Sequence, residues 1–121
     1  MKQREQRKFI RYDSLHLLDY QLLDEEGNPG IYSMGRTIDV SIDGLKLETT
    51  TEIKIDTRLL ITVGIEDDLV DLEGRTTHSM PHDGRFIAGI TFLKITKNGR
   101  RVLAKYVEAF RRIKQQLDKK A

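Results

Sequence analysis

The chain has no cysteine and no tryptophan, and only two of its 121 residues are proline. The lack of cysteine excludes disulfides, thiol catalysis and cysteine-ligated zinc. No apolar run approaches the roughly 20 residues of a membrane-spanning helix. The basic start of the chain is not followed by the apolar region of a secretory signal. We therefore expect a cytoplasmic protein with no segment inserted in a membrane.

The small net charge of +2 hides a separation of charge along the chain. Residues 1–11 have five basic side chains and one acidic side chain. Residues 12–96 have seven basic and sixteen acidic side chains, and residues 97–121 have nine basic and two acidic ones. The three parts therefore carry +4, −9 and +7. Basic ends of this kind fold back on an acidic body or attract an anion. The length fits one domain, with residues 1–12 expected as a flexible basic arm and residues 13–121 as the folded body.

Short alternating segments between residues 15 and 93 predict β-strands. In residues 44–49, two leucines point to one side while Lys46 and Glu48 point to the other. Asp83-Gly84 is typical of a tight hairpin turn. Patterns of this kind predict six strands, at residues 15–23, 36–41, 44–49, 58–65, 69–78 and 85–93.

The apolar period then changes to the three-and-four spacing of one helical face. We expect a helix over about residues 97–119, with Thr96 as its N-cap. Six short strands and a terminal helix predict a mostly β protein, a six-stranded antiparallel β-barrel with a C-terminal α-helix. The apolar face of this helix either packs on the barrel or forms a homodimer seam. We favour packing on the barrel, because the face covers only two heptads, too few for a coiled coil. The face consists of Leu103, Tyr106, Phe110, Ile113 and Leu117.

Two arginines four residues apart, Arg7 and Arg11, form the first candidate binding group. Residues at this spacing share a side in a strand and in a helix, so both can converge on one ligand. The planar fork of arginine matches phosphate oxygens and the O6/N7 edge of guanine. Gln6 and Lys8 flank the first arginine and are candidates for supporting contacts.

The second candidate group is Asp39, Ser41 and Gly44, around the expected turn between two strands. Alternation places the carboxylate and the hydroxyl on the same strand face. A carboxylate accepts hydrogen bonds from the N1–H and N2–H₂ edge of guanine, and a hydroxyl can donate to a phosphate or a base. The glycine permits either a positive φ or a close backbone approach. An ordinary hairpin is the alternative, since these are turn-forming residues.

The order of the two groups, Arg-x-x-x-Arg and then Asp-x-Ser-x-x-Gly, resembles the signature of PilZ domains. Gly44-Leu45-Lys46-Leu47 is similar to the family's glycine-led strand. Gly89-Ile90-Thr91-Phe92 is similar to its closing Gly-x-x-Phe strand. The resemblance extends from about residue 5 to residue 113, which is nearly the whole chain.

The resemblance implies a β-barrel that binds the bacterial second messenger cyclic di-GMP at its surface. By transfer from the family, Arg7 and Arg11 would bind phosphates and guanine, Asp39 and Ser41 would hold a guanine, and Gly44 would shape the turn.

The family is divided between binding one ligand and binding an intercalated pair, influenced by the residue before the first arginine, here Gln6. His78 lies in the region where the family often has tryptophan.

The function that the resemblance implies is a non-enzymatic cyclic di-GMP receptor that changes conformation and regulates a downstream protein in motility, adhesion or polysaccharide output. One alternative is a small barrel that binds nucleic acid, which the acidic body and the four Tyr and four Phe make less favourable. The other is a PilZ-like adaptor acting only through protein contacts. No cofactor or metal is expected, because His78 and His82 have Pro81 between them and no evident third ligand.

Overall fold

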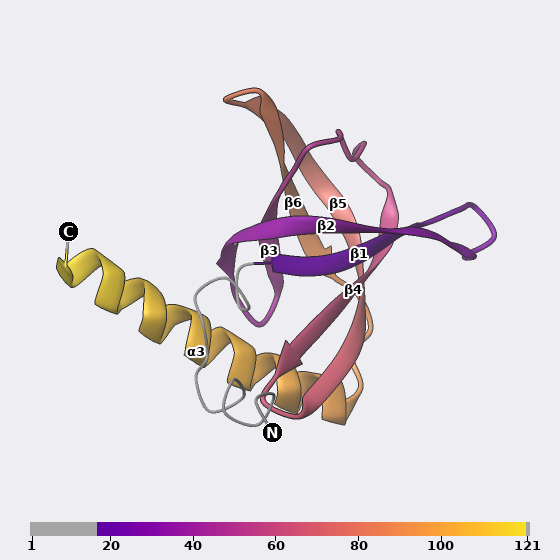
Figure 1. Cartoon of the computed structure of the whole chain (residues 1–121). Coiled ribbons are helices and arrows are strands. Elements are labelled where there is room, and N and C mark those ends of the chain that lie inside the picture. The colour runs from indigo at the N-terminus through magenta and orange to yellow at the C-terminus, as the bar shows by residue number, and fades with distance from the viewer. Residues whose placement is uncertain (1–16, 121) are drawn as a thin grey trace, which may run out of the picture.

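The computed structural model describes residues 17–120, with side chains for residues 17–116. Gln6, Arg7, Lys8 and Arg11 therefore lie outside the described residues. Within that range six strands and one helix are present (Figure 1). They are β1 (Leu17–Leu23), β2 (Pro29–Val40), β3 (Gly44–Thr49), β4 (Arg58–Ile65), β5 (Asp68–His82), β6 (Arg85–Phe92) and α3 (Lys97–Lys120).

The strands form a closed antiparallel barrel in the order β1-β2-β3-β6-β5-β4. Pairing of β1 with β4, for example Tyr20 opposite Ile61, joins the two ends of the sheet. In this order β1 lies opposite β6 across the barrel. The predicted barrel with a C-terminal helix is confirmed.

Strands β2 and β5 are longer than the sequence predicts. β2 begins at Pro29, which pairs with Leu23, and β5 continues to His82, which pairs with Arg85. These extensions project beyond the barrel, so both of their faces meet solvent and the alternation of apolar and polar residues is lost. Ile31, for instance, is 86% exposed.

The predicted tight turn between β5 and β6 is confirmed. Asp83 and Gly84 both have positive φ, at 49° and 77°. Positive φ at both central residues is the geometry that favours Asp-Gly in two-residue hairpin loops.

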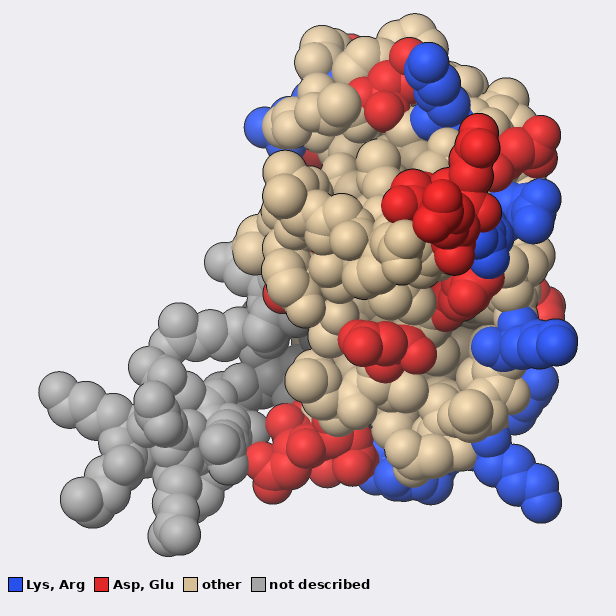
Figure 2. Space-filling view, turned by 90° about the vertical axis from the view of Figure 1, so that its right-hand side faces the viewer, with Lys and Arg blue, Asp and Glu red and all other residues tan. Residues whose placement is uncertain are grey.

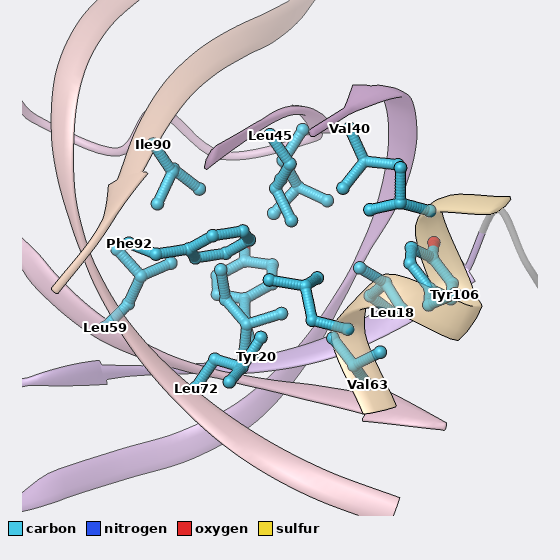
Figure 3. Packing of buried hydrophobic residues seen from close by; sticks show 14 of the residues in the cluster. Leu18, Tyr20, Val40, Leu45, Leu59, Val63, Leu72, Ile90, Phe92 and Tyr106 are labelled. Carbon is cyan, nitrogen blue, oxygen red and sulfur yellow. The ribbon is translucent and has the colours of Figure 1, made fainter. Parts of the chain in front are cut away.

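The barrel interior is filled by one cluster of apolar side chains from all six strands. Figure 3 shows Tyr20, Leu72 and Phe92 packed beside one another in this cluster. Leu47, Leu59 and Ile61 have no exposed surface at all. Burial of such side chains contributes about 1.5–3 kcal/mol each relative to leaving them exposed. Removal of apolar surface from water therefore holds the barrel closed.

Helix α3 covers one end of the barrel and then extends past it (Figure 1). The backbone N–H of Gly99 donates to Thr96 Oγ1 at 2.9 Å, which confirms the predicted N-cap. Leu103, Tyr106 and Phe110 are fully buried against the strands, whereas Ile113 is only partly buried. The apolar face thus packs on its own barrel. The side chain of Leu117 lies outside the described residues.

The basic outer face of α3 meets the acidic body at Asp68. Lys105 Nζ and Arg101 Nη1 lie 3.3 and 3.6 Å from Asp68 Oδ2. The hydrogen bond from Lys105, followed by the charge of Arg101, lowers the pKa of Asp68. On the face shown in Figure 2, acidic side chains lie on a largely uncharged surface, and Lys and Arg lie mainly along its edges. No helix within residues 17–120 has the length and apolar character needed to cross a bilayer.

A buried hydrogen bond joins α3 to β2, and its removal gives a first prediction. Tyr106 Oη lies 3.1 Å from Thr37 Oγ1, and both residues are 0% exposed. Tyr106→Phe leaves the Thr37 hydroxyl without this partner, so we expect a loss of about 1–3 kcal/mol in the free energy of unfolding. Urea denaturation at pH 7 measures it. A Thr37→Val, Tyr106→Phe double variant should recover part of the loss, because neither hydroxyl then remains buried.

The same tyrosine gives a pH prediction. Burial raises the pKa of Tyr106 from 10.0 to about 12. The folded pKa of Tyr106 lies above the unfolded one, so the folded state favours the neutral phenol. The contribution of this phenol to the free energy of unfolding is therefore fully present below pH 10 and is lost as the pH rises towards 12. The wild-type free energy of unfolding should therefore fall in that window by up to about 1.4 kcal/mol per pH unit more than that of Tyr106→Phe. Parallel slopes for the two proteins in alkaline urea titrations would contradict it.

Candidate functional site

The turn between β2 and β3 is built by local hydrogen bonds. Ser41 N donates to Gly44 O at 2.8 Å, and Asp43 N donates to Ser41 Oγ at 3.2 Å. A hydrogen bond between a serine hydroxyl and the backbone two residues on is a usual reason for serine in turns. The backbone N–H of Phe92 in β6 donates to Asp43 O at 2.8 Å. The turn is therefore fixed both internally and to a strand distant in the sequence.

Gly44 is required by a close backbone approach. A Cβ at this position would lie 2.2 Å from the carbonyl oxygen of Ile90 in β6, far inside contact distance. The described glycines with positive φ are Gly27 and Gly84, so Gly44 does not use the left-handed region. Of the two roles that the sequence allows for this glycine, the structure shows the second.

Asp39 faces the outside of the barrel. A β-bulge lies between Thr37 and Asp39. Val40 is 2% exposed and points into the core, and the exposed carboxylate lies on the opposite side, as the alternation predicts. Asp39 Oδ1 accepts a hydrogen bond from Val40 N at 3.0 Å. The other carboxylate oxygen makes no hydrogen bond to a described residue.

Cross-strand pairing extends this outer surface over four strands. Asp39 is opposite Lys46 in β3, Lys46 is opposite Gly89 in β6, and Gly89 is opposite His78 in β5. Gly89 leaves room for its neighbour, because a Cβ there would lie 3.2 Å from the His78 Cβ. The row therefore has a low point at Gly89 between a cation and an imidazole.

A hollow of 230 Å³, which we call the polar hollow, lies beside this row. It brings together Asp39, Ser41 and Gly44 from the sequence-predicted group. Its rim also includes Lys46, Thr77 and Gly89, which the site prediction did not include. The alternation in β3 already placed Lys46 on the outer face, but only the register shows that it lies next to Asp39.

A second hollow of 510 Å³ borders the polar hollow and shares Lys46 and Gly89 with it. Its lining is mainly apolar, and we call it the apolar hollow. The side chains that make it so are Ile38, Ile55, Met80 and Ile87, with His78 and Ser79 beside them. The outer face of β2, β3, β6 and β5 thus has a recess rimmed by charged and hydroxyl groups beside a larger recess that is mainly apolar.

Comparison with known families decides what kind of domain this is. The family model described as PilZ domain matches residues 5–109. The chain belongs to the PilZ domain family. The match includes the arginine pair and the Asp-x-Ser-x-x-Gly turn, and this family binds cyclic di-GMP. PilZ domains are receptors for this ligand and are not enzymes as a family.

A structural comparison agrees with the PilZ fold. The chain is similar to the PilZ domain of CeSA from a cellulose-synthesizing bacterium, with a TM-score of 0.56 and 15% sequence identity. The similarity covers 79% of this chain and 92% of that one. At this identity the likeness shows the fold alone. No curated protein matches the chain.

The close approach at Gly44 gives a prediction for this PilZ domain. Gly44→Ala forces β3 away from the Ile90 carbonyl, so we expect the free energy of unfolding to fall by about 2 kcal/mol or more. Gly84→Ala is the comparison, because no atom lies within 4 Å of its added Cβ and only its φ of 77° is unfavourable. That strain costs about 1–2 kcal/mol. Chemical denaturation of both variants tests the difference, and an undisturbed Gly44→Ala would show that the strands separate at little cost.

Proposed function

We propose that this PilZ domain is a cyclic di-GMP receptor whose polar hollow receives a guanine of the ligand. One observation carries the proposal. The three signature residues Asp39, Ser41 and Gly44 line one outward-facing hollow, and Lys46 stands at its rim. An acceptor, a hydroxyl and a cation are thus collected at one open recess.

The polar groups of the hollow complement a guanine nucleotide. One oxygen of the Asp39 carboxylate remains available to accept from the N1–H and N2–H₂ edge of the base. As a donor to the described residues, the Ser41 hydroxyl makes only a long contact of 3.5 Å to Gly44 O, so it can turn to donate to a base or a phosphate oxygen. The ammonium of Lys46 attracts the phosphate charge. The apolar hollow beside them suits the flat face of a purine, since ligand sites combine mainly apolar walls with a few polar groups.

The basic arm completes the proposed receptor. Arg7 and Arg11 supply guanidinium groups for the phosphates and for guanine, with Gln6 and Lys8 as supporting contacts. The phosphate charge offsets the conformational entropy lost when a flexible segment is ordered. In this proposal the ordered arm changes the domain surface, and a downstream protein responds to that change.

Calorimetric titration with cyclic di-GMP tests the proposal. The wild-type chain should bind, and the titration also gives one or two ligands per chain. Asp39→Ala should weaken binding about tenfold or more, because hydrogen bonds to charged groups contribute about 1.5–3 kcal/mol. Asp19→Ala is the matched control, because Asp19 is also an exposed strand aspartate but belongs to β1, opposite β6 in the barrel. Arg11→Ala should abolish detectable binding.

Two results would contradict the proposal in different ways. Wild-type affinity in both Asp39→Ala and Arg11→Ala would place the ligand elsewhere on the domain. No heat with cyclic di-GMP would refute the receptor, and a salt-sensitive titration with a short single-stranded RNA would then favour nucleic-acid binding.

A further inference from the structure

A cleft of 610 Å³ separates the β2–β3 turn from helix α3. One wall is formed by Ser41, Ile42 and Asp43, and the other by the outer face of α3 between Ala104 and Gln115. Ser41 also lines the polar hollow. The serine therefore stands where the two recesses meet, with the hollow on one side and the cleft on the other.

Among the described side chains, the charges lining the cleft leave one cation, Arg111, without an ion-pair partner. Arg112 Nη2 donates to Glu108 Oε1 at 2.6 Å, and this pair neutralises itself. The guanidinium of Arg111 makes no hydrogen bond or ion pair with any residue among the described side chains, and it is exposed. The remaining charged side chain of the lining, Asp43, lies across the cleft on the turn.

The size of the polar hollow indicates that a dinucleotide must extend beyond it. Its 230 Å³ is below the range of about 300–1,000 Å³ usual for small-molecule sites. Two continuations are open on this surface. The apolar hollow suits a base. The cleft suits a phosphate, because it offers the guanidinium of Arg111, which has no partner among the described side chains. A ligand with one guanine at Asp39 and Ser41 would then place its second base in the apolar hollow and a phosphate in the cleft.

We propose that Arg111 is a further phosphate-binding residue of the cyclic di-GMP site, which makes α3 one wall of that site. The inference rests on the proposed function. Arg111 comes from a helix whose neighbouring residue Phe110 is fully buried, so its backbone is held in place before a ligand arrives. A group on a rigid element loses less entropy on binding than one on a flexible arm. The backbone that carries Arg111 is in this way positioned before binding, in contrast to what we expect of the arm that carries Arg7 and Arg11.

The placement also gives Asp43 a defined effect. Its carboxylate lies on the cleft wall opposite Arg111 and repels a phosphate entering between them. Replacing it should therefore leave the affinity unchanged or raise it. If Arg111 acted only by attracting the turn through Asp43, the same replacement would lower the affinity. Asp43→Asn thus separates a phosphate contact from a structural ion pair.

The test compares calorimetric titrations of cyclic di-GMP into wild type, Arg111→Gln, Arg111→Lys and Arg100→Gln, together with Asp43→Asn and Arg11→Ala. Arg100 is the matched control, because it is exposed, has no side-chain partner among the described residues, and lies on the same helical face about 16 Å from Arg111. Arg111→Gln should weaken binding about tenfold, Arg111→Lys less, and Arg100→Gln not measurably. Thermal unfolding of each variant checks that the fold is unchanged.

The outcomes distinguish a failure of the Arg111 proposal from a failure of the proposed cyclic di-GMP binding. Wild-type affinity in Arg111→Gln, with binding still lost in Arg11→Ala, would overturn the role of Arg111 alone. Equal weakening by Arg100→Gln and Arg111→Gln would reduce the effect to net charge and would also overturn it. A loss of affinity in Asp43→Asn as large as in Arg111→Gln would assign an ion pair instead. No binding by wild type would overturn the proposed function and this inference together.

Discussion

The close approach of Gly44 to the backbone of β6 is the contact on which the barrel and the candidate site both depend. It lets β3 pair with β6 from Gly44 to Thr49. The hydrogen bond from Phe92 N to Asp43 O then fixes the β2–β3 turn. On the inner side of β3, Leu45 and Leu47 are buried in the core. On the outer side, Lys46 lies next to Asp39 of the candidate site. One backbone contact thus positions core and surface together.

Helix α3 links the apolar core to the charged surface near the site. Its inner face closes the barrel end through Leu103 and Phe110, and Tyr106 bonds to Thr37 of β2. Its outer face forms one wall of the cleft beside the turn. Because the inner face is buried, a side chain on the outer face is presented from a rigid support. Binding groups on such supports are held more accurately than those on loops.

Much of the fold could be predicted because its signals are local. Alternation over residues 44–49 and the Asp83-Gly84 turn each depend on a few neighbours in the chain. The ends of β2 and β5 were missed because their exposed extensions carry no alternation. Part of the candidate site could be read from the sequence, because Asp39, Ser41 and Gly44 line one hollow. Asp39 and Ser41 share one motif, whereas Thr77 comes from a strand that no local pattern connects to them. Arg7 and Arg11 remain a prediction.

The sequence alone determined the number of strands, the helix with its apolar face, and the two motifs that identify the family. The tertiary structure decided the strand order, the reason for Gly44, the neighbours of Asp39, and the position of Arg111 across from the turn. The physical reason is the range of the interactions. Periodicity and turn chemistry act within a few residues, but the register between strands and the docking of a helix are set by burial of the whole core, which only the folded chain specifies.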